Sequence, residues 1–165
     1  MEGASETGRN HPHAGGEPYR VLLAEDDPEM RGLLAHALHH DGYMVDECRD
    51  GHHLVARLVS ADPGYFDIII TDIRMPGLNG LDFLEQLRRC ANVPPAVLIT
   101  AFGDEETHNR AHRLGAAAIL DKPFDIGDLL TTVRNVFTTH TPAGAPHTAD
   151  DDNHARHQPH EGGSS

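Results

Sequence analysis

The chain has 165 residues, of which 38% are hydrophobic, and it carries a formal net charge of −13. This length fits one domain with a sizeable core plus terminal segments. The acidic balance argues against nucleic-acid binding, which needs clustered Lys and Arg, and no apolar run approaches a membrane span of about 18 residues. Cys48 and Cys90 form no short metal-binding or redox spacing, so we expect a cytoplasmic protein with reduced thiols.

Apolar side chains concentrate in the middle of the chain. We therefore expect a disordered arm over 1–18, a folded domain over 19–138, and a disordered, His-rich acidic tail over 139–165. Within the domain, five apolar segments alternate with five segments of helical periodicity. The predicted strands are 19–24, 43–48, 68–72, 96–100 and 116–120, and the predicted helices are 28–40, 51–61, 80–90, 104–114 and 125–137.

This alternation predicts an α/β fold, in which helices cover both faces of a parallel sheet. The run Ile68–Ile70 is β-branched throughout and is typical of a central strand that is buried on both faces. The segment 43–48 is more polar and is expected nearer an edge. The helix over 51–61 is expected to bury Leu54, Val55, Leu58 and Val59.

Polar side chains stand where the predicted strands end. Asp26 and Asp27 follow the first strand, Asp72 ends the third, and Thr100 and Lys122 end the fourth and fifth. Parallel strands bring these ends to one edge of the sheet, where open α/β sheets bind ligands. Clustered carboxylates require a cation, and Mg²⁺ suits an all-oxygen site. Lys and Thr can stabilise phosphoryl oxygens, so Asp72 is a plausible nucleophile towards a phosphoryl group.

These motifs carry a resemblance to a known family. Residues 19–138 resemble the receiver domain of two-component response regulators, and the motifs in this sequence are Glu25-Asp26-Asp27, Thr71-Asp72-Ile73-Arg74-Met75-Pro76-Gly77, Ile99-Thr100-Ala101 and Asp121-Lys122-Pro123-Phe124. The resemblance implies a flavodoxin-like, doubly wound sheet of five strands in the order 2-1-3-4-5, with five helices. It also implies a cis peptide bond between Lys122 and Pro123.

The same resemblance assigns roles to the residues at the strand ends. Asp72 would be the phosphoacceptor, and Thr100 and Lys122 would contact the phosphoryl oxygens. Asp26 and Asp27 would position Mg²⁺ together with Asp72, with Asp27 the more direct ligand and the main-chain carbonyl of Arg74 another. The phosphoryl donor would be a histidine kinase or a phosphorelay protein. Beyond accepting the phosphoryl group and slowly losing it, no enzymatic turnover is expected.

Two positions bear on how such a site would work. Ile119 stands where the family has an aromatic switch residue, which puts the usual switching route in question. Arg74 follows the phosphoacceptor by two residues, and we expect it to affect the lifetime of the phosphoryl group.

Arg74 also occupies the position where haloacid-dehalogenase-like phosphatases need a second Asp, which argues against that class. A phosphorylation-independent pseudo-receiver that acts as a docking module remains the alternative.

No recognisable output module follows the predicted domain. We therefore expect a stand-alone response regulator that signals by protein–protein interaction or onward relay, without direct contact to nucleic acid or membrane. The histidines of the C-terminal tail are interpreted as solvated polar residues because a Gly/Pro-rich segment gives them no fixed geometry. His108 and His112 are interpreted as surface residues of the fourth helix.

Overall fold

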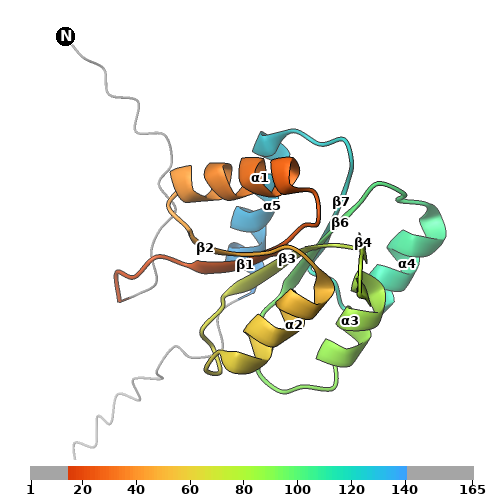
Figure 1. Ribbon diagram of the computed structural model, residues 1–165, viewed down its shortest axis with the longest axis horizontal. Helices are drawn as coiled ribbons and strands as arrows, with labels where there is room; N and C mark the ends of the chain where they lie inside the picture. Colours follow the sequence, from red (N-terminus) through yellow and green to blue (C-terminus); the bar gives the residue numbers. More distant parts are fainter. Residues whose placement is uncertain (1–14, 141–165) are drawn as a thin grey trace, which may run out of the picture.

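The computed structural model describes residues 15–140 (Figure 1), so nearly all of the predicted arm and tail lies outside the described residues. Five parallel strands form the main sheet, in the order β2-β1-β3-β6-β7. Counted along the chain, this is the predicted order 2-1-3-4-5. The strands are β1 (Arg20–Ala24), β2 (Met44–Cys48), β3 (Ile68–Asp72), β6 (Ala96–Thr100) and β7 (Ala118–Asp121). The helices are α1 (Pro28–His40), α2 (Gly51–Ser60), α3 (Gly80–Leu87), α4 (Glu105–Arg113) and α5 (Ile126–Thr139).

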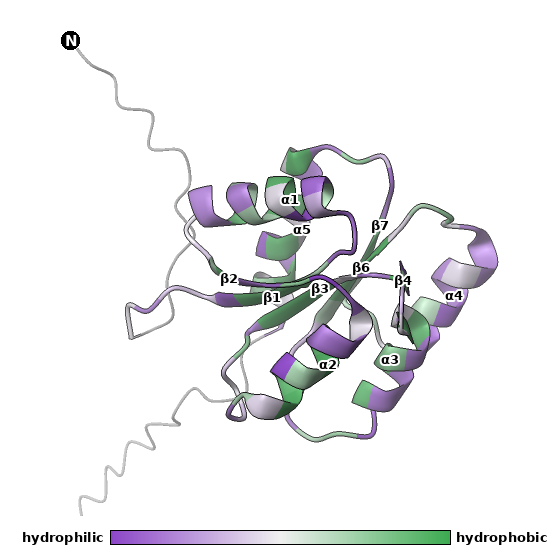
Figure 2. Ribbon diagram, viewed as in Figure 1, coloured by the Kyte–Doolittle hydropathy of each residue, from purple (hydrophilic) through white to green (hydrophobic). Residues whose placement is uncertain are grey.

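Helices cover both faces of this sheet. In Figure 1, α1 and α5 lie on one side and α2, α3 and α4 on the other. Every residue of β3 and β6 is buried, as expected of central strands with apolar side chains on both faces. Figure 2 shows the same division, since the central strands are hydrophobic while the helices carry polar residues on their outer sides. Among the described helices, none has the length and apolar character needed to cross a membrane.

Four of the helices begin at a side chain that accepts hydrogen bonds from their first amides. Asp27, Asp50, Asn79 and Asp104 occupy these N-cap positions. An N-cap acceptor satisfies amide groups that would otherwise have no partner in the helix. The helices therefore begin where short polar residues follow the strands, which fixes the connecting loops at the carboxyl edge of the sheet.

The strand β2 forms one edge of the sheet and is more polar than its neighbours. Asp46 and Glu47 lie in its centre and both take part in ion pairs. Asp46 pairs with Arg57 of α2, and Glu47 Oε1 lies 3.7 Å from Nε of Arg31 of α1. The prediction that the segment 43–48 lies at an edge is confirmed.

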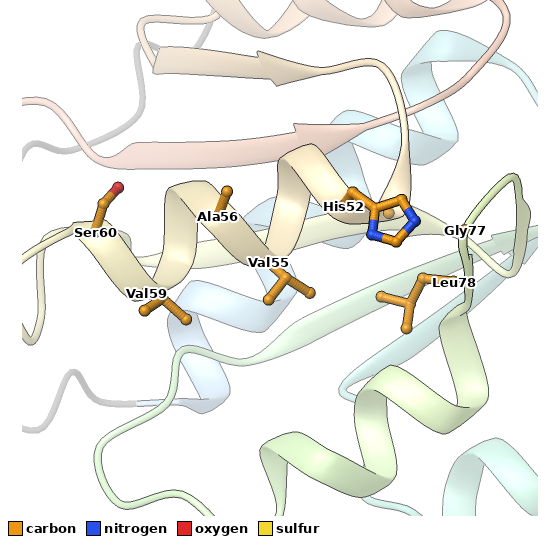
Figure 3. A pocket seen from close by; sticks show the side chains of 8 residues that line it. His52, Val55, Ala56, Val59, Ser60, Gly77 and Leu78 are labelled. Atoms are coloured by element: carbon orange, nitrogen blue, oxygen red, sulfur yellow. The ribbon is translucent and has the colours of Figure 1, made fainter.

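The structure corrects one part of the predicted core. Val55 and Val59 were expected to be buried, but Val59 is 78% exposed and Val55 is 36% exposed. The helix α2 contacts the sheet through a narrower stripe that includes Leu54 and Leu58. Val55 and Val59 instead line an open pocket of about 380 Å³ against Leu78 (Figure 3).

The loop after Asp72 contains a short hairpin that the sequence did not predict. Its strands are β4 (Arg74–Met75) and β5 (Leu78–Asn79), which pair antiparallel. Gly77 lies in the turn between them with a positive φ of 83°, a conformation that glycine adopts without strain. The hairpin holds Arg74 in a defined position two residues after Asp72.

Candidate functional site

Asp72 lies at the carboxyl end of β3 and is only 6% exposed. One carboxylate oxygen, Oδ1, accepts a hydrogen bond of 2.9 Å from the amide of Arg74. The other, Oδ2, accepts one of 2.7 Å from Nζ of Lys122, which follows the end of β7. The main-chain turn and the lysine therefore fix both oxygens of a nearly buried carboxylate.

Lys122 also reaches a second buried acid. Its Nζ lies 3.3 Å and 3.4 Å from the two carboxylate oxygens of Glu25, which is 1% exposed. Burial, and after it the charge of Asp72, raise the pKa of Glu25 to about 7 against the opposing effect of Lys122. Burial alone would lower the pKa of Lys122, but its hydrogen bond to Asp72 and the two carboxylate charges leave it raised. The lysine therefore remains a cation between two acids.

Three carboxylates meet at this point. Glu25, Asp26 and Asp72 each offer an oxygen, and these oxygens lie within 4.8 Å of one another. Asp26 is exposed to solvent, while the other two are buried. A half-open set of carboxylate oxygens suits Mg²⁺, which binds few protein ligands and retains water molecules. The donor set therefore fits the expected ion.

The structure places Asp27 elsewhere. Its Oδ1 accepts hydrogen bonds from the amides of Glu29 and Met30, at 2.9 Å and 3.3 Å, and so caps α1. We expected Asp27 to be the more direct metal ligand, but its carboxylate is used by the helix and does not join the cluster. Pro28 could have indicated this, because proline favours the first helical position and makes Asp27 the N-cap.

Glu25 is the residue that sequence reasoning left without a role. It directly follows Ala24, the last residue of β1, so it continues the strand to the edge of the sheet. The three consecutive acids thus have separate positions. Glu25 is buried beside Lys122, Asp26 faces solvent within the cluster, and Asp27 begins the helix.

Thr100 lies at the end of β6, next to β3, and is 1% exposed. Its Oγ1 accepts a hydrogen bond of 3.1 Å from the amide of Phe102. The ring of Phe102 lies beneath the guanidinium of Arg74, with 4.5 Å between Cζ and the ring centroid. The two loops that follow Asp72 and Thr100 are therefore joined by a cation–π contact.

The strand β7 and the loop after it bring further polar groups to this edge. The peptide bond between Lys122 and Pro123 is cis, as the resemblance implies. Oδ1 of Asp121 and Nε2 of His108 on α4 are hydrogen-bonded at 2.8 Å. A Cβ at Gly103 would lie 1.6 Å from Oδ1 of Asp121, so glycine allows the loop before α4 to approach β7. His108, expected as a surface residue, is thus partly enclosed and paired.

These groups together can support phosphoryl transfer. Asp72 supplies a fixed nucleophilic oxygen, Lys122 a cation beside it, and Thr100 a hydroxyl on the neighbouring strand. The acids next to Asp72 can hold a divalent cation that would offset phosphoryl charge. The pocket of Figure 3 is separate, because its lining includes none of these residues.

Comparisons with known proteins point to one family. The model of the response regulator receiver domain matches residues 21–134. The transcriptional regulatory protein TcrA of Mycobacterium tuberculosis is 36% identical over 115 residues, which are 70% of this chain and 44% of TcrA. PdtaR of the same organism, also a transcriptional regulatory protein, is 37% identical over 117 residues, 70% of this chain and 55% of PdtaR. The chain thus spans about half the length of these relatives.

Solved structures give the same result. The chemotaxis response regulator CheY4 of Vibrio cholerae shares 30% identity with a TM-score of 0.66, over 72% of this chain and 98% of CheY4. The response regulator TrrA of Thermotoga maritima, in complex with Mg²⁺ and BeF, shares 26% identity with a TM-score of 0.63, over 72% of this chain and 98% of TrrA. With its sheet order and the acids, threonine and lysine at one edge, the chain belongs to the response regulator receiver domain family.

Proposed function

We propose that the chain is a response regulator that accepts a phosphoryl group on Asp72 from a histidine kinase or a phosphotransfer protein. The observation that carries the proposal is the nearly buried Asp72 carboxylate, held 2.7 Å from Nζ of Lys122 beside Glu25 and Asp26. Signalling would proceed by binding another protein or by onward relay, and the acidic net charge supports protein contact over direct DNA binding. A cytoplasmic location belongs to the same proposal.

In the transfer step, an oxygen of Asp72 attacks phosphorus and forms an acyl phosphate. The bond between phosphorus and the donor's histidine nitrogen breaks, and that nitrogen keeps the electron pair. Mg²⁺ bound by Glu25, Asp26, Asp72 and the main-chain carbonyl of Arg74 would offset the charge of the phosphoryl oxygens. Lys122 supplies a fixed positive charge on the other side, and Thr100 donates its hydroxyl to a phosphoryl oxygen.

The first test is intact-mass measurement after incubation with Mg²⁺ and acetyl phosphate. Wild type is expected to gain one labile phosphoryl group, and Asp72→Asn is expected to gain none because its amide is not a nucleophile. Asp82→Asn, which changes an exposed aspartate on α3, serves as the matched control and should behave as wild type. Absence of any gain in wild type, with acetyl phosphate and with kinase donors, would contradict the proposal and favour a pseudo-receiver.

A second test distinguishes the roles of the neighbouring acids Glu25 and Asp27 in binding Mg²⁺. Glu25→Gln is expected to raise the Mg²⁺ concentration needed for half-maximal phosphorylation by about tenfold, because it removes one charged oxygen from the cluster. Asp27→Asn should leave that concentration nearly unchanged, since Asp27 caps α1 and Asn caps helices about as well as Asp. A larger effect of Asp27→Asn than of Glu25→Gln would show that Asp27 is the ligand.

A further inference from the structure

The outer side of α2 carries apolar side chains that the sheet does not cover. Val59 is 78% exposed and Val55 is 36% exposed, although both are aliphatic. They lie four residues apart, and Figure 3 shows their side chains on the same side of the helix. Single exposed valines are common, but these two line one open pocket together with Leu78. The pocket therefore marks a surface that can receive another apolar group.

The hairpin β4–β5 closes one end of this pocket. Gly51 is the first residue of α2, and a Cβ there would lie 2.1 Å from Cβ of Leu78. Glycine thus lets the hairpin approach the first turn of the helix. A Cβ at Gly77 would lie 2.5 Å from the ring of His52, so this ring covers the turn of the hairpin. The pocket of about 380 Å³ is lined by the hairpin at one end and by α2 along its length.

The pocket differs from the rest of the molecule in its charge. Among the described residues, those that line it include no Asp, Glu, Lys or Arg. In the whole chain, 24% of the residues are charged and the formal net charge is −13. Two copies of so acidic a protein repel one another, and a surface without carboxylates is where they can approach closely. The face around the pocket is therefore suited to contact with a second copy.

The two ends of α2 carry opposite charges. Arg49 lies two residues before the helix, and its side chain is 79% exposed although it lies 3.7 Å from Asp50. Asp62 lies two residues after the helix and is exposed. When two α2 helices lie antiparallel, the Arg49 end of each meets the Asp62 end of the other, and a twofold axis makes this contact occur twice. The charges therefore favour an antiparallel pair over a parallel one.

We propose that two copies of the chain pack α2 against α2 in antiparallel orientation, with Val59 of each copy inserted into the pocket of the other. Val59 then lies opposite Val55 of the second copy and beside its Leu78. The same register places Asp62 opposite His52 of the second copy, one turn from Arg49 and within reach of that long side chain. Each copy supplies both the projecting side chain and the pocket that receives it, as a twofold interface requires.

The contact is small, because it consists of one helix and one hairpin from each copy. A standard interface buries roughly 1,600 Å² in total, and a smaller one gives a dimer that dissociates on dilution. The pocket includes none of the residues that hold the phosphoryl site. The dimer therefore does not require phosphorylation of Asp72, and its failure would leave the proposed function untouched.

The test measures the mass of the full chain by sedimentation at increasing concentration. Wild type is expected to dimerise with a Kd between about 1 μM and 1 mM, because interfaces below the standard size are weak. Val59→Glu should weaken the dimer by about tenfold or more, since it puts a charge into the apolar pocket. Leu33→Glu adds the same charge at a 53% exposed leucine of α1, and it should dimerise as wild type does.

Three results would overturn the proposal. One is wild type that stays monomeric at a chain concentration of about 1 mM. Another is a dimer that Val59→Glu leaves intact, and the third is a dimer that Leu33→Glu abolishes. Because Val59 and Leu33 are both exposed, circular dichroism should show that either variant folds as wild type does.

A charge exchange tests the antiparallel orientation. Arg49→Asp and Asp62→Arg should each weaken the dimer by about threefold, because each removes two exposed ionic contacts. The double variant restores both contacts with their signs reversed and keeps the net charge of wild type, so its Kd should return to the wild-type value. A double variant that is no tighter than the single variants would overturn the antiparallel arrangement.

Discussion

The helices α5 and α4 cover opposite faces of the same sheet, but they are held in different ways (Figure 1). The helix α5 buries Leu129, Val133 and Val136 completely or nearly so, whereas within α4 only Ala111 is buried. At the end of α5, the ring of Phe137 stacks on Tyr19 with 4.1 Å between the centroids. The attachment of α5 is thus mostly apolar.

Polar contacts take the place of this packing at α4. His108 reaches Asp121 at 2.8 Å, and Arg110 reaches Asp82 at 3.2 Å, with exposed or partly exposed side chains in both pairs. Exposed pairs of this kind contribute little to stability because water screens them. The difference indicates that α4 can separate from the sheet at lower free energy than α5 can. The less firmly attached helix has its N-cap at Asp104, directly after the loop that carries Phe102.

The largest expected effect is on the free energy of unfolding when the apolar contact of α5 is removed. Leu129→Ala should lower it by about 3 kcal/mol, because Leu129 is fully buried and its truncation leaves a cavity. The matched change on the other face is Leu114→Ala at the end of α4, which should cost less than half as much because Leu114 is only partly buried. Urea unfolding measures both values, and equal losses would contradict the comparison.

A smaller effect is expected for the ion pairs of the two helices. Arg134 of α5 holds Asp41 through two hydrogen bonds, of 2.6 Å and 3.3 Å, and the Asp41 side chain is 12% exposed. Arg134→Met should lower the free energy of unfolding by about 1 kcal/mol, a value reduced by the exposure of Arg134. Arg110→Met on α4 should change it by a few tenths at most. A greater loss for Arg110→Met would show that α4 is the better anchored helix.

Much of this architecture could be predicted from the sequence. Apolar runs such as Ile68–Ile70 predict strands that are buried on both faces. Where such runs alternate with segments of helical periodicity, few arrangements are possible other than a parallel sheet covered by helices. Asp72 and Thr100 end their strands and Lys122 follows the end of another. Because these strands are parallel, the three residues were expected at the same edge of the sheet. The structure brings Lys122 to hydrogen-bond distance of Asp72. Strand order was implied only by the resemblance.

What escaped prediction depends on how neighbouring elements meet. The division of roles among Glu25, Asp26 and Asp27 follows from the exact residue where α1 begins, and periodicity does not fix helix ends to one residue. Val59 shares the apolar stripe of α2, yet the helix is rotated so that Val59 faces solvent. The contact of Arg74 with Phe102 joins two loops, and loop geometry leaves no periodic signal.

The polar edge strand β2 has a consequence for the behaviour of the protein at high concentration. An exposed edge offers unpaired amide and carbonyl groups to any other strand, which is a common route to aggregation. Asp46 and Glu47 occupy that edge, and their pairing with Arg57 and Arg31 keeps both charged side chains fixed beside it. A second β2 that paired with this edge in register would bring like carboxylates beside one another, which disfavours edge-to-edge pairing of two sheets at β2.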